Sequence, residues 1–320
     1  MQVKAADQTA AEPRTRPENR VPPPRTAAPR WRSRKVQGLA YATPTAVFVT
    51  VFFLLPLLLV GQMSLSDWPL LAGDRGINAP ENYTDATDTT LFWPAVRFTL
   101  LYTVIVTVVL LGLALLLALL VQEFRPAAGF FRTVYFLPSA LGLASASLLF
   151  WGLYSPTTGP LSRILENLGL VDDPVSFLGT PTSALLSTVF LIVWKFAGFY
   201  MLILLVGLQR IPHEVFEAAR MDGASRGQIF RSITLPLLRP SLALTLLLCV
   251  TGSLLAFDQF FVLTKGGPDN STVTVVQLIY REAFQRMNLG TAAALSVIVL
   301  GVLLLLNALQ FRGLRRADES

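Results

Sequence analysis

Long apolar stretches separated by short polar segments run through most of the chain. Six of these stretches are long enough to cross a hydrocarbon core of about 30 Å, which takes about 20 residues of helix. They lie at 38–61, 96–121, 131–154, 184–208, 238–262 and 290–311. The pattern predicts an all-α membrane protein with six transmembrane helices in one domain, residues 38–311.

The composition agrees with a membrane protein and narrows the possible chemistry. Of 320 residues, 53% are hydrophobic and 14% are charged, which is too apolar for a soluble domain of this length. The single cysteine, Cys249, allows no internal disulfide. The single histidine, His213, leaves no histidine cluster for a metal, so we expect no metal site.

Basic residues predict how the chain lies in the membrane. Residues 1–37 are rich in proline and in Lys and Arg, and we expect them to form a disordered tail. Nineteen Lys and Arg residues fall on the side of the two termini and six on the other, with Lys195 inside the membrane. The positive-inside rule therefore places the tails 1–37 and 312–320 in the cytoplasm. We interpret the basic tail as a topogenic charge cluster and not as a nucleic-acid-binding segment.

A polar interruption at 211–236, between the fourth and fifth apolar stretches, predicts two short helices joined by a turn. Gly223 can adopt the left-handed conformation that ends a helix. Ser225 and Gln228 have the spacing of a capping box, so a second helix can begin at once and run to Ile233, before Pro236.

The first of these helices has a small apolar face that another protein could approach closely. Val215, Ala218 and Ala219 fall on one side at helical spacing. So shallow a face gives little reason for burial within the chain itself, and it therefore favours docking of a partner. The alternative is an ordinary amphipathic connector lying on the membrane.

The same segment resembles the EAA loop of the membrane subunits of binding-protein-dependent ABC importers. The resemblance implies that the loop is cytoplasmic and forms a coupling helix that fits a cleft on an ATPase subunit. We expect Ala218, Ala219 and Gly223 to give a close fit and Glu217 to act as a polar tether. The coupling residues that it implies are Glu217, Ala218, Ala219, Asp222, Gly223, Ile233, Leu235 and Pro236.

Further motifs resemble the maltose-type branch of sugar permeases. Phe257-Asp258 precedes Leu263-Thr264 and Gly266-Gly267-Pro268, and Phe131-Arg132 and Leu137-Pro138 stand at the start of the third stretch. Gly159 to Leu165 is similar to a Gly-Leu-Leu-Asn loop of the family, with Ser162 in place of Asn. The resemblance implies a type I ABC importer permease fold in the bacterial inner membrane. It also implies a second homologous permease, two ATPase subunits and an extracytoplasmic solute-binding protein as partners.

The chain itself lacks the means to bind ATP. A Walker A motif needs Gly-Lys-Ser or Gly-Lys-Thr, and none of the four lysines stands in that context. We therefore expect no enzyme activity and no cofactor in this chain, with ATP and Mg²⁺ held by the partner ATPase.

Lys195 lies deep in the fourth stretch, where a lysine costs about 2.5–3.5 kcal/mol on insertion scales. It should therefore face either a partner helix or a water-filled path, and the sequence leaves both open. Aromatic neighbours suit a sugar ring, which has apolar faces and a hydroxyl edge. The candidate substrate path comprises Trp194, Lys195, Phe199, Tyr200, Phe257 and Asp258.

The sequence thus predicts a non-enzymatic permease subunit of an ATP-driven importer for a sugar or oligosaccharide. A polyol or a sugar phosphate such as glycerol phosphate is the alternative substrate, for which Lys195 would be an anion partner. An ion-coupled secondary transporter is a more distant alternative, because only Asp258 is an acid within a span. A membrane enzyme is disfavoured by the lone His213, and a non-transporting scaffold stays open.

Overall fold

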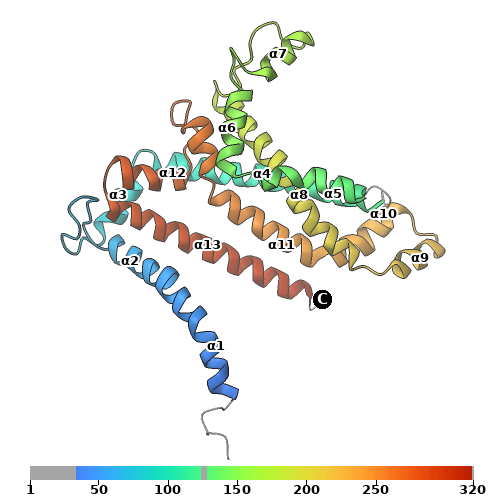
Figure 1. Cartoon of the computed structure of the whole chain (residues 1–320), viewed down its shortest axis with the longest axis horizontal. Coiled ribbons are helices and arrows are strands. Elements are labelled where there is room, and N and C mark those ends of the chain that lie inside the picture. The colour runs from blue at the N-terminus through green and yellow to red at the C-terminus, as the bar shows by residue number, and fades with distance from the viewer. Residues whose placement is uncertain (1–33, 124–127, 319–320) are drawn as a thin grey trace, which may run out of the picture. The chain divides into compact units, whose positions relative to one another are not determined.

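The computed structural model describes residues 34–123 and 128–318 (Figure 1). In these residues the regular elements are helical, and β pairing is limited to isolated bridges. The predicted disordered tail, 1–37, lies almost entirely outside the described residues. In order, the elements are α1 (Arg34–Val49), η1 (Thr50–Leu54), α2 (Leu55–Ser64), α3 (Glu81–Asp88), α4 (Phe92–Glu123), α5 (Ala128–Phe136), η2 (Leu137–Ala140), α6 (Leu143–Leu153), α7 (Pro160–Asn167), α8 (Pro181–Gln209), α9 (His213–Met221), α10 (Arg226–Ile229), η3 (Phe230–Thr234), α11 (Leu235–Leu254), η4 (Phe260–Thr264), α12 (Val275–Tyr280), η5 (Arg281–Gln285) and α13 (Leu289–Asp318).

The chain divides into two compact units, one ending at Pro56 and the other beginning at Leu57. The described part of the first unit is helical, with the π-helical turn η1 just before Pro56. The second unit repeats this arrangement, since the π-helical turn η3 comes just before Pro236. A proline lacks the N–H that a helix needs and its ring crowds the carbonyl four residues back, so a locally wider turn accommodates it.

Five helices are long and apolar enough to span a membrane: Gly38–Ser64, Phe92–Gln122, Pro181–Gln209, Arg226–Leu254 and Leu289–Arg312. The predicted third span is different, because Gly129–Ala140 and Leu143–Leu153 are bent by 91° at a break between them. The predicted span 131–154 is therefore broken in the middle, and the bent pair can count as the sixth span. Leu141 and Gly142 at the break have extended backbone, which interrupts the helix.

The main core of the second unit lies where α4 and α11 pack on α8. One stripe of α4 is buried at nearly every fourth residue, whereas its other faces carry exposed Leu and Val. Side chains four apart form a ridge along a helix, and the exposed apolar faces suit lipid. The buried stripe is Tyr102, Val106, Leu110, Ala114, Ala118 and Val121.

Two glycines let α8 approach its neighbours closely. A Cβ on Gly198 would lie 1.9 Å from the Tyr135 carbonyl oxygen of α5, and a Cβ on Gly207 would lie 2.2 Å from Ser241 Oγ of α11. Either contact would force the helices apart. Small residues at such crossings are how membrane helices gain contact area.

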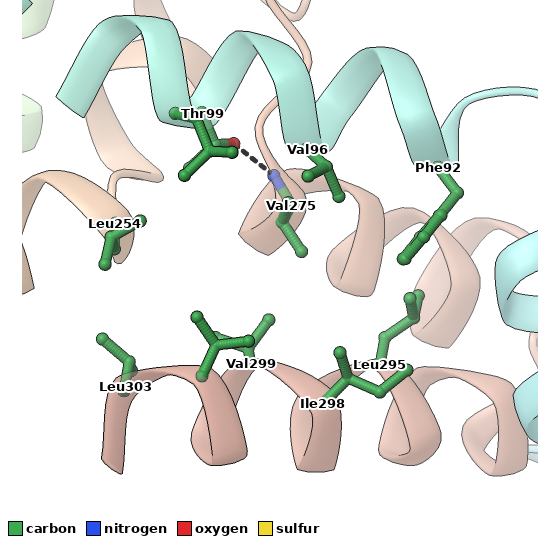
Figure 2. A pocket seen from close by; sticks show the side chains of 11 residues that line it. Phe92, Val96, Thr99, Leu254, Val275, Leu295, Ile298, Val299 and Leu303 are labelled. Atoms are coloured by element: carbon green, nitrogen blue, oxygen red, sulfur yellow. Dashed lines mark hydrogen bonds between the residues drawn. The ribbon is translucent and has the colours of Figure 1, made fainter. Parts of the chain in front are cut away.

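A second, smaller core joins α12 to α4 and α13. Thr99 of α4 accepts a hydrogen bond from the Val275 amide at 3.0 Å, as Figure 2 shows. Below this bond, Leu254, Val299 and other apolar side chains surround a cavity of about 90 Å³. The hydrogen bond fixes the start of α12 against α4.

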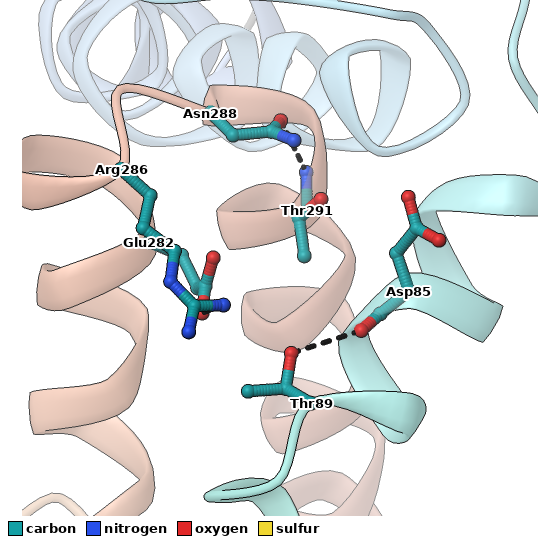
Figure 3. Close-up of polar contacts among 6 residues, drawn as sticks. All are labelled: Asp85, Thr89, Glu282, Arg286, Asn288 and Thr291. Atoms are coloured by element: carbon teal, nitrogen blue, oxygen red, sulfur yellow. Dashed lines mark hydrogen bonds and ion pairs between the residues drawn. The ribbon is translucent and has the colours of Figure 1, made fainter.

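Polar contacts fix the corner between η5 and α13 (Figure 3). Arg286 donates to Glu282 at 2.9 Å, and Asn288 Oδ1 accepts from the Thr291 amide at 3.1 Å at the start of α13. On the neighbouring α3, Thr89 Oγ1 donates to the Asp85 carbonyl at 2.9 Å. The Asn288 contact closes the first turn of α13, and the Thr89 contact closes the last turn of α3.

Candidate coupling hairpin and transport cavity

The polar segment 211–236 begins with the helix–turn that its sequence predicts. α9 starts at His213 with Pro212 as its N-cap and ends at Asp222. Gly223 follows with φ +77°, in the left-handed region that glycine tolerates best. Ser225 and Gln228 form the expected capping box, in which the Ser225 amide donates to Gln228 Oε1 at 2.8 Å.

We expected the second helix of the segment to end at Ile233, before Pro236, and this prediction is wrong. α10, η3 and α11 form one continuous helix from Arg226 to Leu254. The continuity has a physical basis, because Pro236 sits in the first turn of α11 behind the π-helical turn. The hairpin is therefore joined directly to a membrane-crossing helix.

The predicted coupling residues divide into an exposed group and a packed group. No residue of α9 is buried, and Glu217, Ala218, Asp222 and Gly223 are exposed, while Ala219 is half-buried. The packed group is Ile233, Leu235 and Pro236, all half-buried within the continuous helix. The exposed group leaves α9 free to contact another protein.

A cavity of about 230 Å³ lies among α4, α6, α8 and α11. It is far larger than the roughly 15 Å³ that one water needs. Its wall combines aromatic rings with polar atoms, as expected of a site for a small polar solute. The aromatic and polar members are Tyr102, Phe196, Tyr200, Ser253, Phe257, Asp258 and Gln259.

Gln259 is the most informative polar residue of this wall. It is 2% exposed, and its Nε2 donates to the Tyr102 hydroxyl at 3.0 Å. Its Oε1 is buried and has no hydrogen-bond partner within the described part of the chain. A buried acceptor without a donor is costly, so this oxygen suits a hydroxyl of a bound molecule.

Lys195 does not line the cavity. Its ammonium donates to the Ser139 carbonyl at 3.2 Å and to the Leu141 carbonyl, both at the break before α6, and lies 4.9 Å from the centre of the Phe196 ring. The side chain is 3% exposed. Of the two alternatives for Lys195, these contacts favour the helix interface.

The other residues of the candidate substrate path are also divided. Tyr200, Phe257 and Asp258 line the cavity. Trp194 instead packs on Phe150, with ring centres 5.2 Å apart. Phe199 packs on Tyr200 at 5.3 Å and is 37% exposed. Three of the six residues thus meet at one site.

Part of the cavity wall exists because the fifth span ends early. α11 stops at Leu254, and not at residue 262 as predicted, and the backbone is irregular from Leu255 to Phe257. Thr274 Oγ1 donates to the Ala256 carbonyl at 2.8 Å and so gives a hydrogen-bond partner to a backbone oxygen of this unwound segment. The unwinding places Phe257, Asp258 and Gln259 in the wall.

Comparisons with known proteins identify the kind of protein that has this architecture. Residues 111–316 match the family described as the binding-protein-dependent transport system inner membrane component. The chain is a member of this family. It is 30% identical to the multiple sugar-binding transport system permease protein MsmF of Streptococcus mutans, over 87% of this chain and 95% of that protein.

Two further likenesses extend this result. The chain is 34% identical to the sn-glycerol-3-phosphate transport system permease protein UgpA of Agrobacterium fabrum, over 72% of this chain and 78% of that protein. Among solved structures, it resembles a chain of a bacterial alginate ABC transporter in complex with a periplasmic protein bound to alginate pentasaccharide. The TM-score is 0.77 at 24% identity, covering 89% of this chain and 97% of the other.

These findings confirm the predicted class. The protein is an ABC importer permease of the inner membrane, which its apolar helices cross several times. It works in a transport system that depends on a binding protein, and its relatives are named as permeases and not as enzymes. The type I importer fold is likewise confirmed.

Sequence reasoning missed four of the aromatic and polar residues of the permease cavity: Tyr102, Phe196, Ser253 and Gln259. Phe196 stands beside Lys195 and had been noted only as an aromatic neighbour. Tyr102 and Gln259 are 157 positions apart and meet only through the packing of α4 against the unwound segment. Gln259 follows Asp258 directly, and two adjacent polar residues at the end of an apolar stretch were the available signal.

Proposed function

We propose that this permease carries a sugar or oligosaccharide through the cavity beside Gln259. The observation that supports this most directly is the wall itself, which offers aromatic faces and an unpaired buried acceptor. Sugar rings have apolar faces that stack on aromatic side chains and hydroxyls that donate to such acceptors. The similarity to a permease of a multiple sugar-binding transport system supports the same class of substrate.

The exposed α9 is where a partner ATPase would act on this chain. Glu214 in its first turn and Arg220 in its last turn both complement the helix dipole, which favours the helical conformation of this short exposed segment. Movement of α9 would reach α11 through the turn at Gly223. Because α10, η3 and α11 are one helix, its far end moves with it, and Cys249, Gly252 and Ser253 there line the cavity.

The assembly would contain a second homologous permease, two ATPase subunits and an extracytoplasmic solute-binding protein. The ATPase subunits would hold ATP and Mg²⁺, since this chain has no phosphate-binding loop motif. Both termini and α9 would lie in the cytoplasm, as the distribution of basic residues predicts. Alternate opening of the cavity to the two sides would then follow nucleotide binding and hydrolysis.

A polyol or a sugar phosphate such as glycerol phosphate is the second candidate substrate. The 34% identity to a glycerol-3-phosphate permease favours it. Lys195 does not, because its ammonium is engaged by two backbone carbonyls and lies outside the cavity wall. Any phosphate would therefore need a different cation.

Reconstitution tests the proposal. The full chain, its partner permease and the ATPase subunits would be placed in proteoliposomes with the solute-binding protein on one side. We expect binding protein loaded with a sugar to stimulate ATP hydrolysis and to drive uptake of the labelled sugar. Uptake that follows an ion gradient without ATP would overturn the proposal and favour a secondary transporter.

A further inference from the structure

A second cleft, of about 210 Å³, lies beyond the transport cavity in the connection between α11 and α13. Its residues come from η4, α12 and η5, outside the candidate membrane spans and on the side predicted to be extracytoplasmic. They are Phe261, Lys265, Gln277, Tyr280, Arg281 and Gln285. Two of the six carry a positive charge and none carries a negative one.

Neither cation of the cleft has a carboxylate partner among the described residues, whereas the nearby Arg286 pairs with Glu282. Arg281 donates instead to neutral acceptors, the Asn270 Oδ1 at 2.7 Å and the Lys265 carbonyl at 3.2 Å. The Lys265 side chain is exposed. The cleft therefore presents two positive charges to an incoming molecule.

The glycine-rich turn of the motif Gly266-Gly267-Pro268 builds one wall of the cleft. Gly266 has φ +86°, and a Cβ there would lie 2.5 Å from Arg281 Nη2 and 3.2 Å from Gln277 Nε2. The positive φ favours glycine here, and the absence of a Cβ lets both side chains lie against the turn. The guanidinium group is held by the Lys265 carbonyl, just before Gly266, and by Asn270.

Gln277 adds an unpaired acceptor. The residue is 2% exposed, and its Oε1 is buried with no hydrogen-bond partner in the described residues. As at Gln259 in the transport cavity, a donor from a bound molecule would remove the free-energy cost of leaving this buried oxygen without a hydrogen bond. A hydroxyl group next to an anionic group would match the acceptor and the two cations together.

Aromatic rings connect the cleft to the transport cavity. Phe261 of the cleft stacks on Phe257 of the cavity wall, with ring centres 5.0 Å apart and an angle of 21° between the planes. Tyr280 of the cleft lies 5.0 Å from Phe261 and 5.5 Å from Phe257. The two sites therefore share a wall of three rings, a surface on which a sugar ring can stack at successive positions.

We propose that this cleft is an outer subsite for an acidic saccharide, in which Lys265 and Arg281 bind a carboxylate or phosphate and Gln277 accepts from a neighbouring hydroxyl. The proposal rests on the proposed function and narrows its substrate class. The ring wall then leads the saccharide from the cleft into the cavity. Asp258 lies in the inner cavity, so the two sites differ in charge and the anionic group is favoured at the outer one.

The test uses the full importer in lipid nanodiscs and three probes that share one ring. Saturation-transfer NMR would measure the binding of methyl glucuronide, glucose 6-phosphate and the neutral methyl glucoside. Lys265→Gln removes one charge and leaves the bonds of Arg281 in place, because those go to the Lys265 carbonyl and to Asn270. Arg75→Gln, at an exposed cation in the loop before α3, is the matched control.

We expect an acidic probe to bind about fivefold more tightly than methyl glucoside, which is the upper end of what one exposed charge pair contributes. Lys265→Gln should reduce that preference, because only Arg281 then faces the anionic group, and Arg75→Gln should leave it unchanged. The better of the two acidic probes identifies the anionic group as carboxylate or phosphate. Equal binding of acidic and neutral probes, or a preference that is as large in Lys265→Gln as in the wild type, overturns the inference but leaves the proposed function standing.

Two further outcomes are distinguishable. If Lys265→Gln weakens binding of the solute-binding protein to the importer while sugar binding is unchanged, the cleft contacts that protein and the inference is overturned. If no probe binds, and no sugar stimulates ATP hydrolysis in the reconstituted system, the proposed function itself fails. The first result is measured without sugar, so the two failures cannot be confused.

Discussion

Replacing Lys195 with Met tests how the bent third span is held. Methionine keeps the unbranched stem and removes the ammonium that bonds the Ser139 and Leu141 carbonyls. Two hydrogen bonds from a charged group contribute about 3–6 kcal/mol together. The substitution also removes the insertion cost of a lysine, about 2.5–3.5 kcal/mol. The midpoints of these two ranges differ by about 1.5 kcal/mol, which is the net loss expected at the break.

Such a loss raises the population of the locally open state about tenfold, since 1.4 kcal/mol is a factor of ten in an equilibrium constant. Hydrogen exchange measured by mass spectrometry in nanodiscs reports this opening directly. We expect amides near residues 141–147, including that of Ala146, which bonds the Gly142 carbonyl, to exchange about tenfold faster. Amides in α13 should be unaffected.

Lys265→Met is the matched control, because it makes the same substitution at an exposed lysine outside the membrane. It should leave exchange at the break unchanged. If Lys195→Met also leaves it unchanged, or slows it, the ammonium does not hold the break. The cost of this lysine would then have to be explained by a role in the transport path.

Three further predictions concern the hairpin, the cavity and the η5 corner. Ala218→Trp should enlarge the exposed face of α9, leave the permease folded in the membrane and lower binding-protein-stimulated ATP hydrolysis at least tenfold. Gln259→Met removes the unpaired acceptor and should weaken binding of the transported sugar about tenfold by saturation-transfer NMR. Burial raises the pKa of Glu282, partly opposed by Arg286, so the folded protein holds this proton more tightly than the unfolded one. The stability that the protonated Glu282 contributes is present below the ordinary glutamate pKa of about 4.3 and is lost as pH rises through the folded pKa. Glu282→Gln should therefore weaken the dependence of the melting temperature on pH in that range.

Each of these predictions has a control and a contradicting result. Leu168→Trp places a tryptophan at an exposed residue after α7 and should leave ATP hydrolysis unchanged. Normal stimulation in Ala218→Trp would remove α9 from the coupling path. Gln62→Met, at an exposed residue of α2 away from both sites, controls for Gln259→Met. Unaltered sugar affinity in Gln259→Met would exclude Gln259 as a ligand. If the melting temperature of Glu282→Gln falls with rising pH as steeply as that of the wild type, another group is responsible for the pH dependence.

The lengths of the apolar stretches predicted most of the helices, because a membrane crossing requires about 20 consecutive apolar residues whatever the tertiary packing. The stretches 96–121, 184–208 and 290–311 lie inside α4, α8 and α13. The turn at Gly223 and the capping box at Ser225 were predictable for another reason. Each rests on local backbone chemistry that needs no distant partner.

The break in the third span could not be predicted from its own residues alone. The stretch 131–154 is continuously apolar, and Pro138 and Gly142 were its only warnings. The carbonyls freed by the break are bound by Lys195, which lies 54 positions beyond Leu141 in the sequence. A local pattern cannot report such a partner.

Only part of the cavity wall could be predicted from the sequence, because contacts between distant residues again position the rest. Tyr200, Phe257 and Asp258 stood out as polar or aromatic residues in apolar stretches. Gln259 enters the wall because the helix unwinds at Leu255 and Thr274 binds the freed Ala256 carbonyl. This bond joins two segments whose approach depends on tertiary packing.

Photocrosslinking from position 218 tests the central claim most directly. A photoreactive amino acid in place of Ala218 would be activated in membranes that contain the whole importer, with the same group at Arg75 as the comparison. We predict that position 218 forms an adduct with the ATPase subunit and that position 75 does not. An adduct of position 218 with the solute-binding protein, or with lipid alone, would contradict the claim that α9 is where the ATPase acts on this permease.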